Sequence, residues 1–294
     1  MLKYFLVDGG KYPISETIER GTFDDRWPRA YLRHISHSRP WTGKPSVTQL
    51  LNGTRMEWLK INSETAIDPD ESAFMLQGSI SHYAMEKAGD VTETRLENDY
   101  VTGVFDTIEW SEGDATLIDY KNYGSYKAGL ILGMEQYDEE IVDLSGSVER
   151  FKSGPRKGEV KTRKAIRYNP EVADEAQYEI RLQTNMYRIL IEQNWRLKVE
   201  KIKCFLTPRD AGTYMAKGRG ILKNTYMLDL PILPGDEVEG YFMAKSAALL
   251  HALETNELPP MCSELENWNS RRCRGYCDVA EYCDSPYKGQ DDEQ

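Results

Sequence analysis

The sequence predicts an α/β protein in which helices flank a mixed central sheet and a cysteine-rich module follows at the C-terminus. Segments between residues 94 and 120 and at 199–206 have the apolar or alternating pattern of strands, whereas 173–193 repeats its apolar side chains with helical spacing. Four of the five cysteines fall between residues 262 and 283. We therefore expect a core in the order α-β-β-β-α-β that precedes the cysteine module.

The first helices of this core follow an N-terminal arm. Residues 1–45 are rich in Gly, Pro, Arg and aromatic residues without a sustained period, which predicts an irregular arm. Ser46 is suited to cap a helix whose interrupted apolar face reaches Leu59. A second helix is expected from near Asp70 to a stop at Gly89.

Strand character follows this second helix. We expect strands at Thr94–Glu97, at Tyr100–Trp110 with a break near Gly103, and at Ala115–Tyr120. Turn-forming residues at 111–114 join the last two. The segment therefore predicts a β-meander with an acidic residue in each of two adjacent strands.

Residues 124–170 contain a short helical segment and then acidic and basic blocks, which predicts a charged, partly mobile insertion. After the helix at Ala173–Gln193 we expect a buried strand at Val199–Leu206, a further strand at Thr225–Leu230 and a helix over Pro234–Leu253.

The chain of 294 residues, 40% of them hydrophobic, is long enough for a core without disulfide support. We expect an arm over residues 1–45, a core over 46–256 and a cysteine module with an acidic tail over 257–294. The apolar start of the chain breaks at Asp8-Gly9-Gly10, and no stretch is long enough to span a bilayer. This predicts a cytoplasmic protein with no membrane association.

A formal net charge of −11 argues against indiscriminate wrapping of nucleic acid, although a local basic groove is still compatible with it. Between Lys152 and Arg167 seven basic residues face the single acid Glu159. This strip is either a solvated charged loop or a surface that contacts phosphates. Three further arginines crowd the cysteine tail: Arg271, Arg272 and Arg274.

Two acids and a lysine form the central catalytic pattern. Asp106 and Asp119 fall on neighbouring strands of the expected meander, and alternation places Asp119 and Lys121 on one face of a strand. Carboxylates suit Mg²⁺ or Mn²⁺, which can activate water for phosphodiester cleavage, and the main-chain carbonyl of Tyr120 is a further candidate ligand. The alternative is a surface hairpin whose ion pair contributes little to stability.

Three other side chains fit the same chemistry. His82 lies on the second expected helix, from which an imidazole can reach a metal beside the carboxylates; the alternative is a core histidine. Gln183 and Tyr187 are four residues apart and share one helix face. They are either substrate-positioning residues or a solvated glutamine beside a core tyrosine.

Four spaced motifs occur in one order: Gly78-x-x-x-His82, Gly103-x-x-Asp106, Asp119-x-Lys121 and Gln183-x-x-x-Tyr187. This order resembles the PD-(D/E)XK nuclease superfamily, specifically the RecB-like nuclease branch and the CRISPR-associated exonucleases with a C-terminal iron–sulfur module. The similarity covers residues 46–283 and implies a restriction-endonuclease-like core. By this resemblance the histidine and two acids bind metal, the lysine is catalytic and the last pair assists near the substrate: His82, Asp106, Asp119, Lys121, Gln183 and Tyr187.

The cysteines Cys262, Cys273, Cys277 and Cys283 suit a [4Fe–4S] cluster or, as the alternative, a structural Zn²⁺. Paired C-x2-C knuckles typical of zinc sites are absent from the sequence, which favours iron–sulfur. Members of the resembled family usually take one cysteine from the first helix, yet residues 51–55 contain none, so Cys262 would supply the fourth thiolate. Cys204 is expected to be a buried apolar residue on a strand.

Two further positions depart from the pattern of that family. The first acid follows Phe105 where proline is usual, and Asp119 stands where Glu is commoner.

The resulting expectation is a metal-dependent DNA nuclease. The resemblance alone implies exonuclease action on single-stranded or end-containing DNA in recombination, repair or phage- or CRISPR-type DNA processing, with a helicase, recombinase or integrase as partner. The alternatives are a non-catalytic DNA-binding accessory protein of the same fold and a zinc-stapled interaction protein.

Overall fold

The computed structural model describes residues 1–23, 26–38, 40–89, 91–111 and 113–288. Glu112 of the expected turn and the last six residues of the acidic tail lie outside this range. Helices combine with sheets that contain both parallel and antiparallel strand pairs, which confirms the mixed α/β class. No helix in the described part of the chain has the length and apolar character needed to cross a bilayer.

The chain divides into two compact units. The first contains Met1–Leu117, Leu182–Ile202 and Pro231–Gln294, and the second contains Ile118–Arg181 and Lys203–Leu230. The expected insertion at 124–170 therefore falls within the second unit, whereas the expected arm and the cysteine module both belong to the first.

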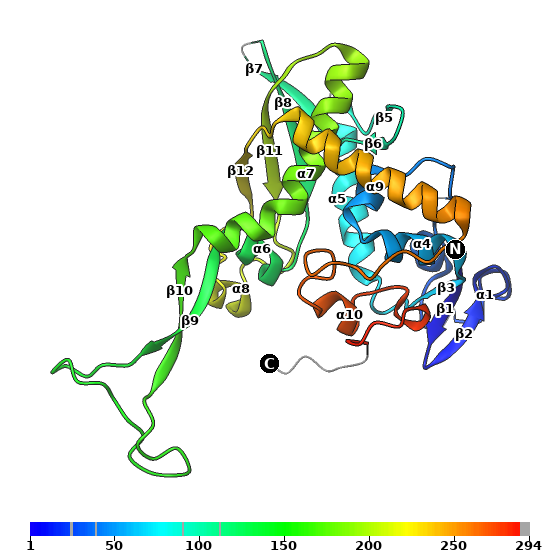
Figure 1. Cartoon of the computed structure of the whole chain (residues 1–294). Coiled ribbons are helices and arrows are strands. Elements are labelled where there is room, and N and C mark those ends of the chain that lie inside the picture. Colours follow the sequence, from blue (N-terminus) through cyan, green and yellow to red (C-terminus); the bar gives the residue numbers. More distant parts are fainter. Residues whose placement is uncertain (24–25, 39, 90, 112, 289–294) are drawn as a thin grey trace. The chain divides into compact units, whose positions relative to one another are not determined.

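A five-stranded sheet has the strand order β12-β11-β8-β7-β4 (Figure 1). Its members are β4 (Val91–Thr92), β7 (Thr107–Ser111), β8 (Asp114–Lys121), β11 (Val199–Leu206) and β12 (Tyr226–Leu230). β8 and β11 each begin in the first unit and end in the second. The expected strands at 115–120, 199–206 and 225–230 are thus confirmed.

The N-terminal segment is not the irregular arm that the sequence predicts. It forms β1 (Leu2–Val7), β2 (Gly10–Pro13), α1 (Ile14–Arg20) and α2 (Arg29–Ile35). Its apolar side chains form a small core of their own: Phe5, Val7, Trp27, Leu32 and Ile35. β1 pairs antiparallel with β2 in a local hairpin, and its other edge pairs in parallel with β3 (Thr65–Ile67), which lies far later in the chain.

The first core helix is divided in two. Ser46 forms a capping box with Gln49, as a helix start requires, but α3 (Val47–Leu51) ends before Gly53 and α4 (Thr54–Asn62) begins after it. Both helices contact α9 (Gly235–Thr255), and the Trp58 indole Nε1 donates to the carbonyl of Ala252 at 3.0 Å.

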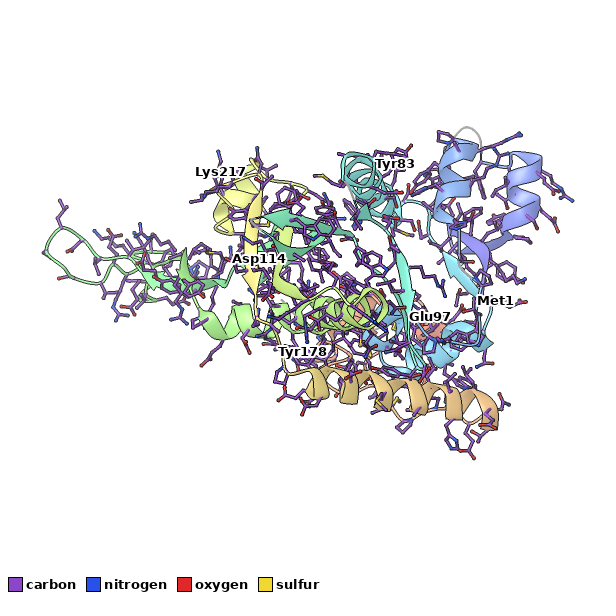
Figure 2. The ribbon with its side chains drawn as sticks, turned by 90° about the horizontal axis from the view of Figure 1, so that it is seen from above. Met1, Tyr83, Glu97, Asp114, Tyr178 and Lys217 are labelled. Carbon is purple, nitrogen blue, oxygen red and sulfur yellow. The ribbon has the colours of Figure 1, made fainter. Side chains whose placement is uncertain are left out.

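The second helix, α5 (Ala73–Ala88), ends at Gly89 as expected and carries His82. None of its residues is fully buried, and Tyr83, labelled in Figure 2, is among its exposed side chains.

The expected meander differs from the observed strands in one respect that concerns the site. β5 (Arg95–Glu97) pairs with β6 (Thr102–Val104) in a separate two-stranded sheet. The chain breaks at Phe105 and Asp106 and not at Gly103. Asp106 therefore lies in the connection between β6 and β7, and the prediction that it lies on a strand is wrong.

In the second unit, α6 (Ser125–Ile131) leads into a ribbon of β9 (Met134–Glu140) and β10 (Thr162–Tyr168). Figure 1 shows the ribbon continuing into a wide loop over residues 141–161. The short helix α8 (Tyr214–Gly218) contacts β10. The long helix α7 (Pro170–Trp195) confirms the helix expected at 173–193.

Candidate functional site

Asp119 and Lys121 form an ion pair at the end of β8. The Lys121 Nζ lies 2.8 Å from a carboxylate oxygen of Asp119, as expected for side chains two residues apart on one strand face. Leu117 and Ile118 are buried beside them, and Asp119 is only 1% exposed. This burial excludes the alternative of a solvated surface pair.

The backbone that carries Lys121 is fixed by the segment that follows β11. The Thr207 amide donates to the carbonyl of Lys121 at 2.8 Å, and the Asn122 side-chain amide donates to the Thr207 hydroxyl at 3.1 Å. The Tyr120 ring stands edge-on to Phe205 at 6.1 Å between centroids. These contacts hold the main chain around the Tyr120 carbonyl, the candidate metal ligand.

Tyr123 is a neighbour of this pair that the sequence analysis missed. Burial raises the pKa of its hydroxyl, with Lys121 opposing the shift and Asp119 adding to it, so the hydroxyl lies within electrostatic range of both groups. Extending the alternation of β8 by one more step, from 119 and 121 to 123, would have identified it.

His82 and Asp106 also lie side by side. The imidazole Nδ1 of His82 is 3.4 Å from a carboxylate oxygen of Asp106, and the Asp106 side chain is 13% exposed. The Glu93 amide donates to the carbonyl of Asp106 at 3.1 Å, which fixes the backbone at this point. An imidazole nitrogen and a carboxylate oxygen at this separation are a donor pair suited to a divalent cation.

Gln183 and Tyr187 contact each other on α7. The Gln183 side-chain amide donates to the Tyr187 hydroxyl at 3.0 Å. Tyr187 is 5% exposed and its ring packs against Gly103, where an added Cβ would lie 3.0 Å from the ring. The core role for Tyr187 is therefore supported, and Gly103 owes its identity to this close approach.

The predicted residues thus meet in pairs. His82 with Asp106 and Gln183 with Tyr187 lie in the first unit, and Asp119 with Lys121 lies in the second. In the described residues no three His, Cys, Asp or Glu side chains are grouped to hold a metal ion. A pair is a sufficient protein contribution for Mg²⁺, which is commonly bound by one or two carboxylates, waters and substrate phosphates.

Three of the four tail cysteines pack against a small apolar cluster that includes residues of α4. Cys262, Cys277 and Cys283 pack against the buried side chains of Met56, Leu59 and Val279, and Cys273 lies on α10 (Arg271–Gly275). Burial raises the pKa of the Cys262 and Cys277 thiols, and the neighbouring Cys273 adds to both shifts. The five cysteines all lie in the described residues and form no disulfide with one another, and Cys204 is buried in β11 as expected.

Two basic side chains of α4 form hydrogen bonds and ion pairs with the C-terminal tail. Arg55 donates to the carbonyl of Pro259 at 2.9 Å and pairs with Asp284. Lys60 pairs with Asp278 at 2.8 Å. The cysteine module is therefore docked by its own polar contacts in addition to the apolar contacts around the thiols.

The basic strip between Lys152 and Arg167 is largely neutralised. Five of its seven basic residues have an acid within 3.0 Å. The pairs are Arg156–Glu159, Lys161–Glu149, Arg163–Glu139, Lys164–Asp138 and Arg167–Glu135. Most are cross-strand contacts of the ribbon, so the strip is an ion-pair ladder and gives little support to a phosphate-binding surface.

Comparison with known proteins gives no family for this chain: no family model matches its sequence, and no curated protein does. A solved structure described as "Crystal structure of SSO0001" is similar at a TM-score of 0.40 and 15% sequence identity. The similarity covers 92% of this chain and 96% of that one. At this level the match assigns neither fold core nor function.

Proposed function

We propose that the protein is a divalent-metal-dependent DNA nuclease with a core of the PD-(D/E)XK type. The buried ion pair of Asp119 and Lys121 supports this proposal most directly. Removing both charges from water is costly, and a hydrophobic pair is often as stable, so such a pair in a core needs a reason beyond stability. Metal binding by Asp119 and proton transfer by Lys121 would be such a reason.

The chain contributes a set of residues that fits a hard cation and a phosphodiester. By the resemblance, the ligands for Mg²⁺ or Mn²⁺ are His82 and Asp106 in the first unit and Asp119 and the Tyr120 carbonyl in the second. Such an ion would acidify water and compensate charge on the phosphate. The Lys121 Nζ, held by Asp119, orients the attacking water and can exchange a proton with it. Gln183 donates to the Tyr187 hydroxyl, and by the resemblance this pair assists near the substrate.

The same proposal assigns a [4Fe–4S] cluster to Cys262, Cys273, Cys277 and Cys283, with Zn²⁺ as the alternative. Burial raises the pKa of the Cys262 and Cys277 thiols and the neighbouring Cys273 adds to both shifts, as expected where a metal would displace the protons. The bound cluster or Zn²⁺ would hold the C-terminal tail against α4. Iron, zinc and acid-labile sulfide in anaerobically purified protein, and their loss in Cys273→Ser, test this assignment.

The substrate follows from the resemblance. We assign single-stranded or end-containing DNA and exonuclease action, in recombination, repair or phage- or CRISPR-type processing, with a helicase, recombinase or integrase delivering the DNA.

The decisive experiment is cleavage of end-labelled single- and double-stranded DNA in Mg²⁺, Mn²⁺ or EDTA. The matched variants are Asp119→Asn and Asp106→Asn, with Asp114→Asn as a control because Asp114 carries an exposed ion pair with Lys201. We expect metal-dependent degradation that both site variants abolish and the control retains. Binding without cleavage by folded, cofactor-loaded protein would instead support a DNA-binding accessory.

A further inference from the structure

A single threonine donates two hydrogen bonds to the main-chain carbonyl of the proposed catalytic lysine. Lys121 is the last residue of β8, and Thr207 is the first residue after β11, the neighbouring strand of the sheet. The Thr207 amide donates to the Lys121 carbonyl at 2.8 Å, and the Thr207 hydroxyl donates to the same oxygen over a longer distance of 3.4 Å. A sheet ladder supplies one donor to a carbonyl, so the second donor is an addition that the sheet does not require.

A second side chain holds this threonine hydroxyl in place. The Asn122 side-chain amide donates to it at 3.1 Å, so the hydroxyl accepts from Asn122 and donates to Lys121. All three residues belong to the second unit, as does Asp119. The contacts therefore run from Asn122 through Thr207 to the residue whose Nζ pairs with Asp119.

Stability does not explain the asparagine. Its Oδ1 is buried and has no hydrogen-bond partner in the part of the chain that the structure describes. A buried acceptor without a partner costs free energy, and an apolar side chain of similar shape would avoid that cost. What the asparagine supplies is the position of the Thr207 hydroxyl.

We propose that Asn122 and Thr207 are positioning residues for Lys121. The role rests on the proposed nuclease function, in which Lys121 orients the attacking water. The direction of the Lys121 carbonyl fixes the peptide plane that follows this residue, and with it the backbone from which the lysine side chain extends towards Asp119. Because β8 ends at Lys121, no further ladder of that strand holds this backbone, and the two side chains do so. A small displacement of a catalytic group is enough to lower a rate strongly.

The test compares Asn122→Leu and Thr207→Val with Thr207→Ser and with the control Thr213→Val. Thr213 is a threonine of the same unit whose hydroxyl accepts from the Ala216 amide at 3.1 Å and caps α8. We expect Asn122→Leu and Thr207→Val to lower kcat for DNA cleavage about tenfold with KM unchanged, as misplacement of a catalytic group does. Thr207→Ser keeps the hydroxyl and should restore most of the lost rate.

Thermal unfolding of each variant separates positioning from stability. Asn122→Leu removes the unpaired oxygen together with one hydrogen bond, so the melting temperature should not fall although kcat does. Thr213→Val removes a helix cap, so the melting temperature should fall while kcat is retained. A loss of kcat that follows the melting temperature across the variants would overturn the inference. An unchanged kcat in Asn122→Leu and Thr207→Val would do the same, and so would a Thr207→Ser protein as slow as Thr207→Val.

Hydrogen exchange of the Thr207 amide, followed by NMR, tests the contact without cleavage. We expect this amide to exchange about tenfold faster in Asn122→Leu and at the wild-type rate in Thr213→Val. Wild-type protein that degrades no DNA, together with this faster exchange, would remove the nuclease and keep the role of Asn122 in holding the Lys121 carbonyl. Cleavage by the wild type, with exchange and kcat both unchanged in Asn122→Leu, would keep the nuclease and remove the positioning role.

Discussion

The sulfur of Cys262 lies where a side chain on Gly53 would begin. A Cβ added to Gly53 would be 2.3 Å from the Cys262 Sγ, and the backbone amide of Met56 donates a hydrogen bond to the Cys262 thiol. Gly53 is the N-cap of α4, and Met56 is the third residue of that helix. Cys262 therefore accepts a hydrogen bond from an amide in the first turn of α4, as an N-cap side chain would, although it lies far along the chain.

This relationship predicts that the serine side chain of Gly53→Ser displaces the Cys262 thiol from the N-terminus of α4. Gly53 has φ of −61°, so the backbone accepts serine, whose hydroxyl can cap α4 in place of the sulfur. The displaced Cys262 then loses its position among the tail cysteines. We expect α4 to remain helical while iron or zinc content falls at least severalfold, measured by metal analysis and circular dichroism.

The control for this variant is Gly240→Ala. Gly240 lies in α9, and a Cβ added there meets nothing within 4 Å, so metal content should not change. Full metal content in Gly53→Ser would show that Cys262 does not contribute a ligand.

The two motif glycines should respond in opposite directions to alanine. A Cβ on Gly103 would lie 2.8 Å from Leu190 and 3.0 Å from the buried Tyr187 ring, whereas a Cβ on Gly78 in α5 meets nothing within 4 Å. We expect Gly103→Ala to cost about 1–3 kcal/mol of unfolding free energy through overpacking. Gly78→Ala should gain about 0.5–1 kcal/mol from helix propensity.

Urea unfolding of both variants measures the difference. A destabilised Gly78→Ala would mean that another part of the protein packs against this position of α5 in solution, contrary to the open space around Gly78 in the structure.

Several elements could be predicted because their sequence signals lie within the element itself. Val199–Leu206 forms the predicted strand to the residue, and from Ile202 onward every second residue is buried. Ser46 forms the capping box expected of a helix start. The pairing of Asp119 with Lys121 likewise followed from the two-residue period of a strand.

Features that depend on distant partners could not be predicted. β1 pairs with β2 in a local hairpin, but its second partner, β3, lies far later in the chain, and the break at Gly53 lies against the sulfur of Cys262. The ion pairs of the ribbon could not be predicted without the pairing register of its strands. Arg163 pairs with Glu139 because β9 and β10 place these two residues opposite each other. Charge composition alone therefore left both a solvated loop and a phosphate-binding strip open.

Removal of Lys121 should reduce stability as well as activity. Lys121→Ala leaves the carboxylate of Asp119, 1% exposed, without the cation that lies 2.8 Å away. A buried charge that loses its partner costs about 3–5 kcal/mol. The neutral pair Asp119→Asn with Lys121→Met should recover most of this loss while remaining without cleavage.

Lys201→Ala is the matched control for the ion pair. Lys201 and Asp114 are 3.2 Å apart with both side chains about half exposed, so the expected loss is below about 1 kcal/mol. Chemical denaturation of wild type, Lys121→Ala, the double variant Asp119→Asn with Lys121→Met, and Lys201→Ala measures these losses of unfolding free energy. Equal losses for Lys121→Ala and Lys201→Ala would mean that water reaches Asp119 and that burial does not perturb it.

Tyr100 should make the stability of the first unit fall in alkali. Its hydroxyl donates to a carboxylate oxygen of Glu239 at 3.2 Å. Burial raises its pKa from 10.0 to about 12, with Asn98 opposing the shift and the Glu239 carboxylate adding to it. Because the folded state favours the protonated tyrosine, the stabilisation is complete below pH 10 and is lost as the pH rises from 10 towards 12.

Tyr100→Phe removes this group, so the difference in unfolding free energy between wild type and variant should shrink as the pH rises from 9 to 11. Allowing for solvent screening of a partly exposed group, we expect a change of about 1 kcal/mol or less. Urea unfolding at pH 9, 10 and 11 measures it, with Tyr214→Phe as the control because Tyr214 is 89% exposed. A difference that stays constant with pH would mean that the Tyr100 hydroxyl is solvated and that its contact with Glu239 does not persist in solution.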